Sequence, residues 1–380
     1  MEATAYTAQS LYTWILDESS NFLLLDVRNP TEFTRFKVEG PKPIDMLNVP
    51  YMEFVEFEEA SVAKVPKGKP VRIVCAKEGS AKFVADILLN NGFTDVGFLA
   101  GGIKSWGNML VPKLLADNGY QLYQFIRPGK ASCSYGLASG GELMLFDPSR
   151  NVDFYQQFAE EKGLAITATF ETHLQADYIA GSNSIAQATS ATFLAPPDDF
   201  KDAQYEYTPA QDGDIYGFTQ PGPEIRVLHT PGHTPGSTCY LIDGTYLVSG
   251  DTMFIQSVGR PDLGGKAEAW SKMLFTTLTQ IIGPMGNSTL ILPGHFADWS
   301  EANEDFAVVD TLGAIRNRNA AIYAINNEAD FYAFIRDNMR EQPPEYAKIR
   351  LINAGLSVVD DEEAEVMDLG KNECAASAGK

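Results

Sequence analysis

The sequence predicts an α/β domain, then a domain of stacked β-sheets, then a helical C-terminal extension. The chain has 380 residues, and an ordinary domain takes about 150, so we expect at least two domains. Short apolar runs alternate with a helical pattern in the N-terminal part, which is typical of a parallel sheet covered by helices. The middle of the chain carries many strand-like runs separated by turns, which favours two packed sheets.

Composition and charge limit the classes of partner. Asp and Glu outnumber Lys and Arg by 50 to 29, which gives a formal net charge of -21. Because such a surface repels nucleic-acid phosphates, we expect no nucleic-acid partner. No apolar run approaches the roughly 18 residues that span a bilayer, and the start of the chain lacks a basic segment followed by an apolar one. We therefore expect a cytoplasmic protein with no membrane partner.

Three apolar runs in the N-terminal region predict buried strands. They are FLLLDV at 22–27, VRIVC at 71–75 and VGFLA at 96–100. The pattern between the last two predicts a helix that Gly92 ends. Cys75 stands at the end of its strand, before a short loop and this helix. Backbone amides in such a loop stabilise a thiolate, so Cys75 is a candidate nucleophile, with a buried structural cysteine as the alternative.

Residues 8–107 resemble the rhodanese, or sulfurtransferase, family. The matching motifs are Asp26-Val27-Arg28 with Glu32-Phe33, the loop from Cys75 to Ser80, Gly92-Phe93, and Gly101-Gly102 with Trp106. The resemblance implies that Cys75 accepts a sulfane sulfur as a persulfide and passes it to a thiol, with Arg28 and Lys77 in the site. Ser80 stands in place of the loop arginine of active members. A domain that only carries the persulfide is therefore the alternative to active sulfur transfer.

Three strand-like segments of the middle region are followed by side chains that bind metals. His173 follows AITATFET, His233 lies in the turn HTPGHTPG, and Asp251 follows TYLVSG. All four histidines of the chain lie between residues 173 and 295. Two imidazoles and one carboxylate match the facial triad that leaves open positions on Fe(II), and zinc also takes these ligands. The sequence therefore predicts one metal site at these strand ends.

Residues 121–300 resemble the metallo-β-lactamase fold and, within it, the persulfide dioxygenases. The matching motifs are Asp147-Pro148, Glu171-Thr172-His173, the turn from Thr230 to Gly236, Ser249-Gly250-Asp251, Gly259-Arg260-Pro261-Asp262 and Pro293-Gly294-His295. The resemblance implies an αββα sandwich. It also implies one Fe(II) per chain, held by His173, His233 and Asp251, with zinc as the alternative cofactor.

Other residues near the predicted metal take supporting roles in this resemblance. Gln175 and Tyr178 stand where binuclear members of the fold have further histidines, so a binuclear zinc site is not expected. His295 is expected near the metal without binding it. Asp177 is expected to orient the site through a hydrogen bond, with weak binding of a second cation as the alternative.

The resemblance also implies residues that bind the substrate. Arg260 lies nine residues after Asp251, where the family uses an arginine to engage the carboxylate of the thiol substrate. The planar fork of donors on arginine suits that task. Thr234, in the same turn as His233, is expected to contact substrate as well.

The two resemblances converge on sulfur chemistry. We predict an enzyme that oxidises a low-molecular-weight persulfide, such as glutathione persulfide, with O2 to sulfite and thiol. The N-terminal domain would handle the sulfane sulfur. The expected partners are small-molecule thiols or persulfides and O2, and the family suggests a homodimer. The alternatives are a zinc-dependent hydrolase of thioesters or lactams and a non-catalytic persulfide-binding protein.

The predicted domain boundaries follow from these patterns. They are a rhodanese-like domain at 1–112, a linker at 113–120, a metallo-β-lactamase-fold domain at 121–300 and a helical C-terminal extension at 301–380. The extension ends in an acidic tail that contains DDEEAEVMD at 360–368. Cys133 and Cys239 are expected in the core. Cys374 follows the acidic run, and the sequence assigns it no role.

Overall fold

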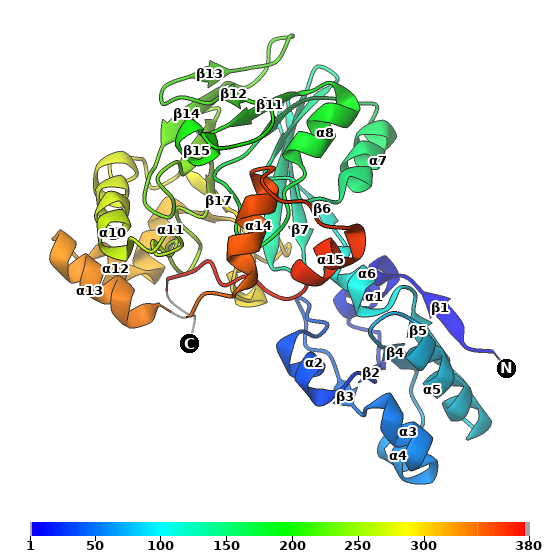
Figure 1. The fold of residues 1–380 in the computed structure, drawn as a ribbon. Helices are drawn as coiled ribbons and strands as arrows, with labels where there is room; N and C mark the ends of the chain where they lie inside the picture. The colour runs from blue at the N-terminus through cyan, green and yellow to red at the C-terminus, as the bar shows by residue number, and fades with distance from the viewer. Residues whose placement is uncertain (1, 340, 377–380) are drawn as a thin grey trace. The chain divides into compact units, whose positions relative to one another are not determined.

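The computed structural model describes residues 2–339 and 341–376, which form two compact units (Figure 1). The N-terminal unit comprises the chain up to Val111 together with residues 127–130 and 369–371. The C-terminal unit comprises residues 112–126, 131–368 and the segment that starts at Asn372. Among the described residues, no helix is long and apolar enough to cross a membrane.

The N-terminal unit is built on a five-stranded parallel sheet in the order β1-β5-β4-β2-β3. The strands are β1 Thr4–Tyr6, β2 Leu23–Asp26, β3 Met46–Asn48, β4 Val71–Val74 and β5 Val96–Leu99. The helices are α1 Ala8–Leu16, α2 Pro30–Arg35, α3 Tyr51–Glu56, α4 Glu58–Lys64, α5 Gly79–Asn90 and α6 Gly102–Asn108. Helical connections are what parallel strands require. The three predicted strands form β2, β4 and β5, and the predicted helix is α5.

The C-terminal unit contains two sheets. The seven-stranded sheet has the order β12-β11-β10-β9-β8-β7-β6, and the six-stranded sheet has the order β13-β14-β15-β16-β17-β18. The strands of the first are β6 Val111–Asp117, β7 Gln121–Arg127, β8 Ser132–Ser139, β9 Glu142–Phe146, β10 Ala165–Phe170, β11 Thr192–Ala195 and β12 Thr208–Pro209. The strands of the second are β13 Ile215–Tyr216, β14 Ile225–His229, β15 Thr238–Ile242, β16 Tyr246–Gly250, β17 Leu290–Pro293 and β18 Asp310–Thr311.

The main core of this unit lies between the two sheets. Phe146 and Phe170 from the first sheet stack with ring centroids 4.8 Å apart, and Tyr240 from the second lies 5.2 Å from Phe170. Helices α7 Val152–Lys162 and α8 Ser182–Thr189 pack against β10 (Figure 1). The further helices are α9 Pro197–Phe200, α10 Ala267–Thr276, α11 Leu312–Arg318, α12 Ala320–Tyr323, α13 Glu328–Asn338, α14 Glu345–Asn353 and α15 Asp361–Met367. This arrangement confirms the predicted rhodanese-like and metallo-β-lactamase folds and the helical C-terminal region.

The segment predicted as a linker, 113–120, instead contributes to the edge strand β6 and the turn that leads into β7. Exposure alternates along the first part of β6, which is the period of a half-buried strand. Leu115 and Ala116 pack against the core between the sheets. Pro112 is tolerated because an edge strand leaves some backbone amides unpaired.

The acidic run at 360–368 forms helix α15 and is not uniformly solvated. Asp360 caps the helix by accepting a hydrogen bond from the amide of Glu363, and three acidic residues occupy the first turn. Negative charge there complements the helix dipole. Asp368 is buried, where one oxygen pairs with Arg150 at 2.9 Å and the other accepts from the amide of Ile179 at 3.0 Å. The end of the run therefore anchors the helix.

Candidate metal centre

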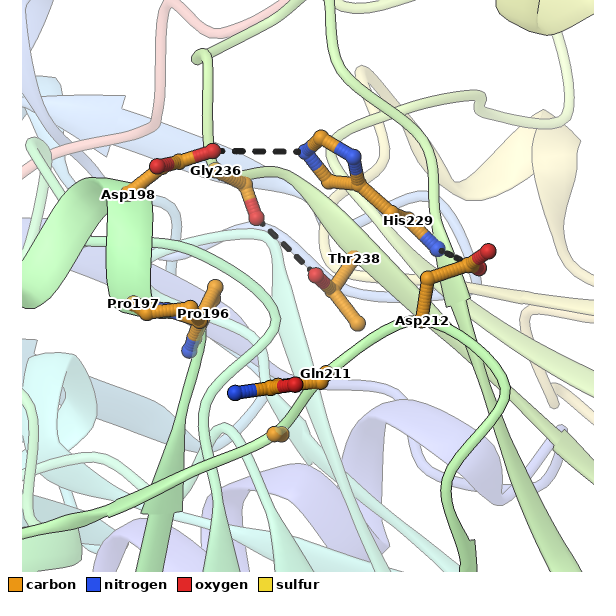
Figure 2. Close-up of a pocket in the computed structure, with 9 residues that line it drawn as sticks. Pro196, Pro197, Asp198, Gln211, Asp212, His229, Gly236 and Thr238 are labelled. Atoms are coloured by element: carbon orange, nitrogen blue, oxygen red, sulfur yellow. Dashed lines mark hydrogen bonds and ion pairs between the residues drawn. The ribbon is translucent and has the colours of Figure 1, made fainter.

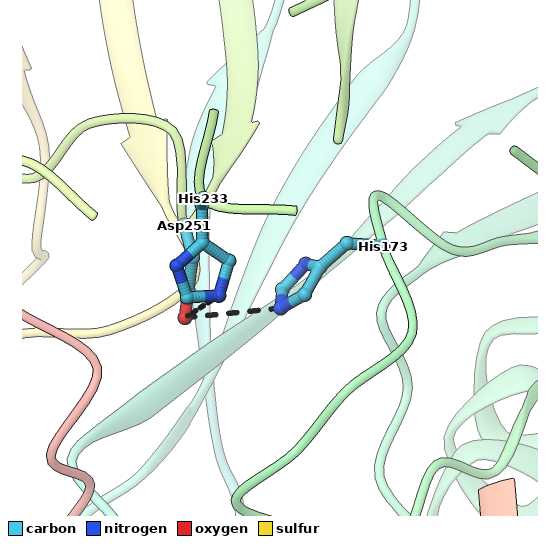
Figure 3. Close-up of side chains that lie close together, drawn as sticks. All are labelled: His173, His233 and Asp251. Atoms are coloured by element: carbon cyan, nitrogen blue, oxygen red, sulfur yellow. Dashed lines mark ion pairs between the residues drawn. The ribbon is translucent and has the colours of Figure 1, made fainter. Parts of the chain in front are cut away.

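The structure brings the three predicted metal ligands together at one edge of the sandwich. His173 follows β10, His233 lies in the turn between β14 and β15, and Asp251 follows β16. All three are buried, and their ligand atoms lie within 4.8 Å of one another (Figure 3). Asp251 Oδ2 lies 3.8 Å from His173 Nε2 and 3.6 Å from His233 Nε2. Two imidazole nitrogens and a carboxylate oxygen that face a common point form a ligand set for a transition metal.

A backbone carbonyl sets the tautomer of His233. Its Nδ1 lies 2.9 Å from the carbonyl oxygen of Arg260. Because a carbonyl can only accept, Nδ1 carries the proton, and Nε2 presents its lone pair to the centre. This hydrogen bond also fixes the orientation of the ring, as metal-binding histidines require.

A side-chain relay sets the tautomer of His173. The Thr172 hydroxyl donates to Asp147 Oδ2 at 2.8 Å, so its oxygen accepts from His173 Nδ1 at 2.9 Å. The Thr172 amide donates to the other Asp147 oxygen at 2.7 Å. Asp147 has φ +50, a left-handed conformation that is uncommon for residues other than glycine, and these bonds hold it. His173 Nε2 therefore also faces the centre with its lone pair.

His295 holds the third ligand in place without joining the ligand set. Its Nδ1 lies 2.7 Å from Asp251 Oδ1, and its Nε2 forms an ion pair with Asp177 Oδ2 at 2.9 Å. Burial lowers the pKa of His295, but the charges of Asp177 and Asp251 outweigh it and raise that pKa to about 10. His295 is therefore a cation between two carboxylates. It leaves Asp251 Oδ2 as the oxygen that faces the two imidazoles.

The protonation states and unpaired atoms of the centre fit a metal ion. Burial lowers the pKa of His173 to about 3 and also lowers that of His233, so both imidazoles are neutral near pH 7. Burial raises the pKa of Asp251, but His295 and the two other imidazoles hold it below its ordinary value. Among the described residues, His233 Nε2 and Asp251 Oδ2 are buried without a hydrogen-bond partner. A buried polar atom without a partner costs about 1–3 kcal/mol, which a bound ion would offset.

Gln175 and Tyr178 lie beside the centre but face other groups. Gln175 Nε2 lies 3.4 Å from the carboxylate of Glu171. The Tyr178 hydroxyl donates to the backbone carbonyl of Asp147 at 3.2 Å, and its ring lies 6.0 Å from that of His295. Both side chains are buried. They support the loop after β10 and add no ligand atom to the three already described.

The two residues predicted to bind substrate have partners within the protein. Arg260 is 1% exposed, and its Nε and Nη2 bind the two oxygens of Asp262 at 2.7 and 2.8 Å. Its Nη1 donates to the carbonyl of Glu373 at 3.0 Å. The Thr234 hydroxyl donates to Asp199 Oδ2 at 2.6 Å and closes the turn that carries His233. Substrate binding by Arg260 and Thr234 stays a prediction.

His229, the fourth histidine, lies apart from this ligand set. Its Nε2 donates to the carbonyl of Pro235 at 2.9 Å and lies 3.9 Å from Asp198 Oδ2, while its amide donates to Asp212. His229, Asp198 and Asp212 line a cavity of about 120 Å³ next to the turn (Figure 2). His229 therefore stabilises the turn that presents His233.

Cys75 lies at the carboxyl end of β4, in the loop before α5. Burial raises the pKa of the Cys75 thiol, and hydrogen bonds from the amides of Ala81, Lys77 and Ser80 partly offset this. The same amides surround any anion held on the thiol. Gly102 has φ +64, and a Cβ there would lie 2.2 Å from the carbonyl oxygen of Lys77. The loop therefore depends on a glycine at that position.

Arg28 and Lys77 are the other two residues predicted for this site. Arg28 is buried and binds both oxygens of Asp26, with Nη2 at 2.6 Å from one oxygen. The same nitrogen donates to the carbonyl of Phe36 at 2.6 Å. Arg28 therefore ties β2 to the end of α2. Lys77 is exposed, and its backbone amide is the part that reaches the Cys75 thiol.

Sequence reasoning missed one residue at the metal centre, Cys374. Its Sγ, an oxygen of Asp177 and a nitrogen of His295 lie within 4.8 Å of one another, and all three residues are buried. Cys374 lies far from these residues in sequence, and no sequence motif predicts the contact. An unassigned cysteine in a C-terminal segment was the only signal.

Comparisons with known proteins agree with this geometry. A family model described as "Metallo-beta-lactamase superfamily" matches residues 128–311, and one described as "Rhodanese-like domain" matches residues 7–109. The hydroxyacylglutathione hydrolase of Anaeromyxobacter dehalogenans is 30% identical over 185 residues, which cover 48% of this chain and 67% of the relative. The chain belongs to the metallo-beta-lactamase superfamily. This superfamily member also carries a rhodanese-like domain in its N-terminal region.

Two solved structures are similar to this superfamily member. A metallo-beta-lactamase from Staphylococcus aureus has a TM-score of 0.57 at 29% identity, covering 64% of this chain and 76% of that one. ETHE1 from Myxococcus xanthus has a TM-score of 0.52 at 23% identity, covering 65% of this chain and all of that one, and this likeness shows the fold alone. The chain spans about two thirds of the length of the hydroxyacylglutathione hydrolases that it matches.

Proposed function

We propose that the metal centre oxidises the sulfane sulfur of a persulfide with O2, and that the N-terminal unit handles sulfane sulfur at Cys75. The observation that carries this proposal is the ligand set, in which two neutral imidazoles and one carboxylate oxygen face one point. An Fe(II) ion held by His173, His233 and Asp251 would keep open positions that bring sulfur and O2 together. The rhodanese-like domain supports sulfur as the element on which the protein acts.

The overall reaction is R–S–SH + O2 + H2O → R–SH + SO3²⁻ + 2 H⁺. The S–S bond breaks, the sulfane sulfur is oxidised, O2 is reduced, and the thiol takes back a proton. The protein holds its ligands for this reaction through the carbonyl of Arg260, the Thr172 hydroxyl and His295. Burial of all three ligands keeps bulk water away from the reacting sulfur.

Cys75 has a separate role in this proposal. The amides of Lys77, Ser80 and Ala81 face its sulfur and stabilise negative charge at that position. A persulfide anion carries such a charge on its terminal sulfur. Cys75 therefore accepts a sulfane sulfur from one carrier and passes it to a thiol, which breaks one S–S bond and forms another without net oxidation.

A hydrolase of glutathione thioesters is the second candidate. It is favoured by similarity to relatives that are named hydroxyacylglutathione hydrolases. Such a reaction would use zinc at the same three ligands, with a bound water as the nucleophile. The donor set does not distinguish the two metals, so the reaction itself has to be measured.

The test is oxygen consumption by protein loaded with iron under anaerobic conditions and then given glutathione persulfide. We expect rapid uptake with about one iron per chain, and no uptake by His173→Ala, which lacks one of the three ligands. Hydrolysis of a glutathione thioester by zinc-loaded protein, with no oxygen uptake by the iron form, would establish the hydrolase instead. Persulfide binding without either reaction would indicate a binding protein.

A further inference from the structure

We propose that Cys374 is a persulfide carrier at the metal centre, so that the centre oxidises a sulfane sulfur bound to the protein's own C-terminal segment, residues 372–376. This inference rests on the proposed function and names the form in which its substrate reaches the site. A free persulfide such as glutathione persulfide would then load Cys374 and would not be oxidised directly.

The backbone of the C-terminal segment is paired with the loop that follows Asp251. The Arg260 amide donates to the carbonyl of Cys374 at 3.0 Å, and the Ala376 amide donates to the carbonyl of Val258 at 2.9 Å. Gly259 and Ala375 form an antiparallel bridge between these two bonds. The segment is thus an added strand that places Cys374 opposite Arg260.

Arg260 links this strand to a metal ligand. Its amide binds Cys374, its guanidinium binds the carbonyl of Glu373, and its own carbonyl accepts the proton of His233 Nδ1. One residue therefore fixes both the C-terminal segment and a ligand of the metal. The position of Cys374 relative to the centre follows from this shared support.

Side chains outside the loop hold the segment at two further points. The Glu373 amide donates to the Tyr346 hydroxyl at 2.7 Å. Asn372 Nδ2 donates to the carbonyls of Ala131 and Phe296 at 3.1 and 3.3 Å. These bonds fix the two residues that precede Cys374, and the Tyr346 hydroxyl also lies 3.9 Å from its Sγ.

The thiol of Cys374 points into the centre. Cys374 is 1% exposed, and its Sγ lies within 4.8 Å of ligand atoms of Asp177 and His295. Asp177 and Asp251 are the charges that act most strongly on it. The buried atoms Asp251 Oδ2 and His233 Nε2, which lack hydrogen-bond partners among the described residues, independently mark a ligand position in this centre.

A sulfur attached to this thiol would reach further than the thiol itself. An S–S bond is about 2 Å long, so a sulfur added to Cys374 Sγ extends the side chain by that length. By contrast, Cys239 contacts Thr230 at 3.2 Å and the carbonyl of Ser249 at 3.7 Å within the core between the sheets. Of these two buried thiols, Cys374 is the one in contact with the cluster around the metal ligands.

The chemistry takes two balanced steps. In loading, Cys374–S⁻ + R–S–SH → Cys374–S–SH + R–S⁻, so the sulfane sulfur moves and the small thiolate leaves. In oxidation, Cys374–S–SH + O2 + H2O → Cys374–SH + SO3²⁻ + 2 H⁺, with O2 as the oxidant already named in the proposed function. Because Cys374 is buried, loading requires the C-terminal segment to leave residues 258–260, and oxidation occurs after it has paired again.

The first arm of the test locates the sulfur. Protein is incubated with glutathione persulfide without O2, freed of small molecules, alkylated and digested with trypsin, which cuts after Lys371 and releases Cys374 in its own peptide. We expect an extra sulfur on that peptide in both the native protein and His173→Ala. Cys239 serves as the matched buried thiol and should carry none.

The second arm follows that sulfur through oxidation. When O2 is admitted to the loaded, desalted, iron-containing protein, we expect about one sulfite per chain and loss of the extra sulfur from Cys374. The Cys374→Ser variant, treated and desalted in the same way, should form no sulfite. When it is given glutathione persulfide, it should consume O2 at least tenfold more slowly than the native protein. Cys239→Ser should match the native protein, and the iron content of both variants shows that the centre is intact.

The outcomes separate this inference from the proposed function. An unmodified Cys374 peptide, or a Cys374→Ser variant that oxidises glutathione persulfide at the native rate, overturns the carrier role and leaves the dioxygenase standing. An extra sulfur on Cys374 with no oxygen uptake by iron-loaded protein supports the carrier role and overturns the dioxygenase.

Discussion

The two thiols used in this account, Cys75 and Cys374, are both buried but have opposite surroundings. Backbone amides face Cys75, while the carboxylates of Asp177 and Asp251 act on Cys374. Amides stabilise a thiolate, whereas nearby carboxylates oppose one. The comparison teaches that Cys75 is suited to sulfur transfer where it lies, and that Cys374 takes up sulfur only when its segment has left the carboxylates.

The largest effect should come from removing a metal ligand. His233→Ala removes one of the three ligand atoms. We therefore expect the iron content to fall from about one per chain to near zero and oxygen uptake to stop. His229→Ala is the matched control, because it changes a histidine of the same turn that faces away from the ligand set. Elemental analysis of both variants checks this prediction. Equal iron in the two variants would contradict the assigned ligands.

A smaller effect is expected from the relay behind His173. Thr172→Val keeps the size of the side chain but removes the hydroxyl between Asp147 and His173 Nδ1. Losing such a support typically weakens metal binding about 10- to 100-fold. Competition with a chelator measures the affinity. Unchanged affinity would show that the relay does not orient the ring.

The pH dependence of alkylation distinguishes the two thiols. Because burial raises the pKa of Cys75, its thiolate is the minor form near pH 7, and its alkylation rate should rise about tenfold per pH unit up to the raised pKa. Iodoacetamide labelling of metal-free protein, followed by mass spectrometry, gives the rate at each cysteine. Cys374 should be labelled more slowly than Cys75, because its segment must first leave residues 258–260. If the alkylation rate of Cys75 stopped rising below pH 8, this would contradict the raised pKa of its thiol.

A separate effect concerns the stability of the N-terminal unit. Gly102→Ala places a Cβ 2.2 Å from the carbonyl of Lys77 at φ +64, so we expect a loss of at least about 3 kcal/mol in the free energy of unfolding. Gly92→Ala is strained by φ +85 alone, with no atom within 4 Å of the added Cβ, and should cost about 1 kcal/mol. Urea denaturation of the two variants compares these values. Equal losses would mean that the Cys75 loop yields to the added methyl group.

Much of the fold followed from local sequence patterns. Apolar runs such as 22–27 and 71–75 have the length and composition of buried parallel strands, and they form β2 and β4. The meeting of the three candidate ligands was also predictable, because His173, His233 and Asp251 each follow or join strands in recognisable motifs. Their convergence is a property of the sandwich, in which these strand ends meet at one edge.

Other contacts could not be read from local patterns. The guanidinium of Arg260, which is predicted to bind a substrate carboxylate, pairs with Asp262 two residues away. Arg28 pairs with Asp26. Cys374 was missed because strand pairing between its segment and residues 258–260 is a long-range contact that no local pattern encodes. Side-chain partners that depend on tertiary packing are therefore what the sequence did not reveal.

The most direct test of the central claim measures oxygen consumed and sulfite formed by iron-loaded protein given glutathione persulfide. We predict that the native protein forms one sulfite for each O2 consumed and holds about one iron per chain. The His173→Ala variant should form no sulfite and consume no oxygen. Full iron loading with no oxygen uptake would contradict the claim that this centre is a persulfide dioxygenase.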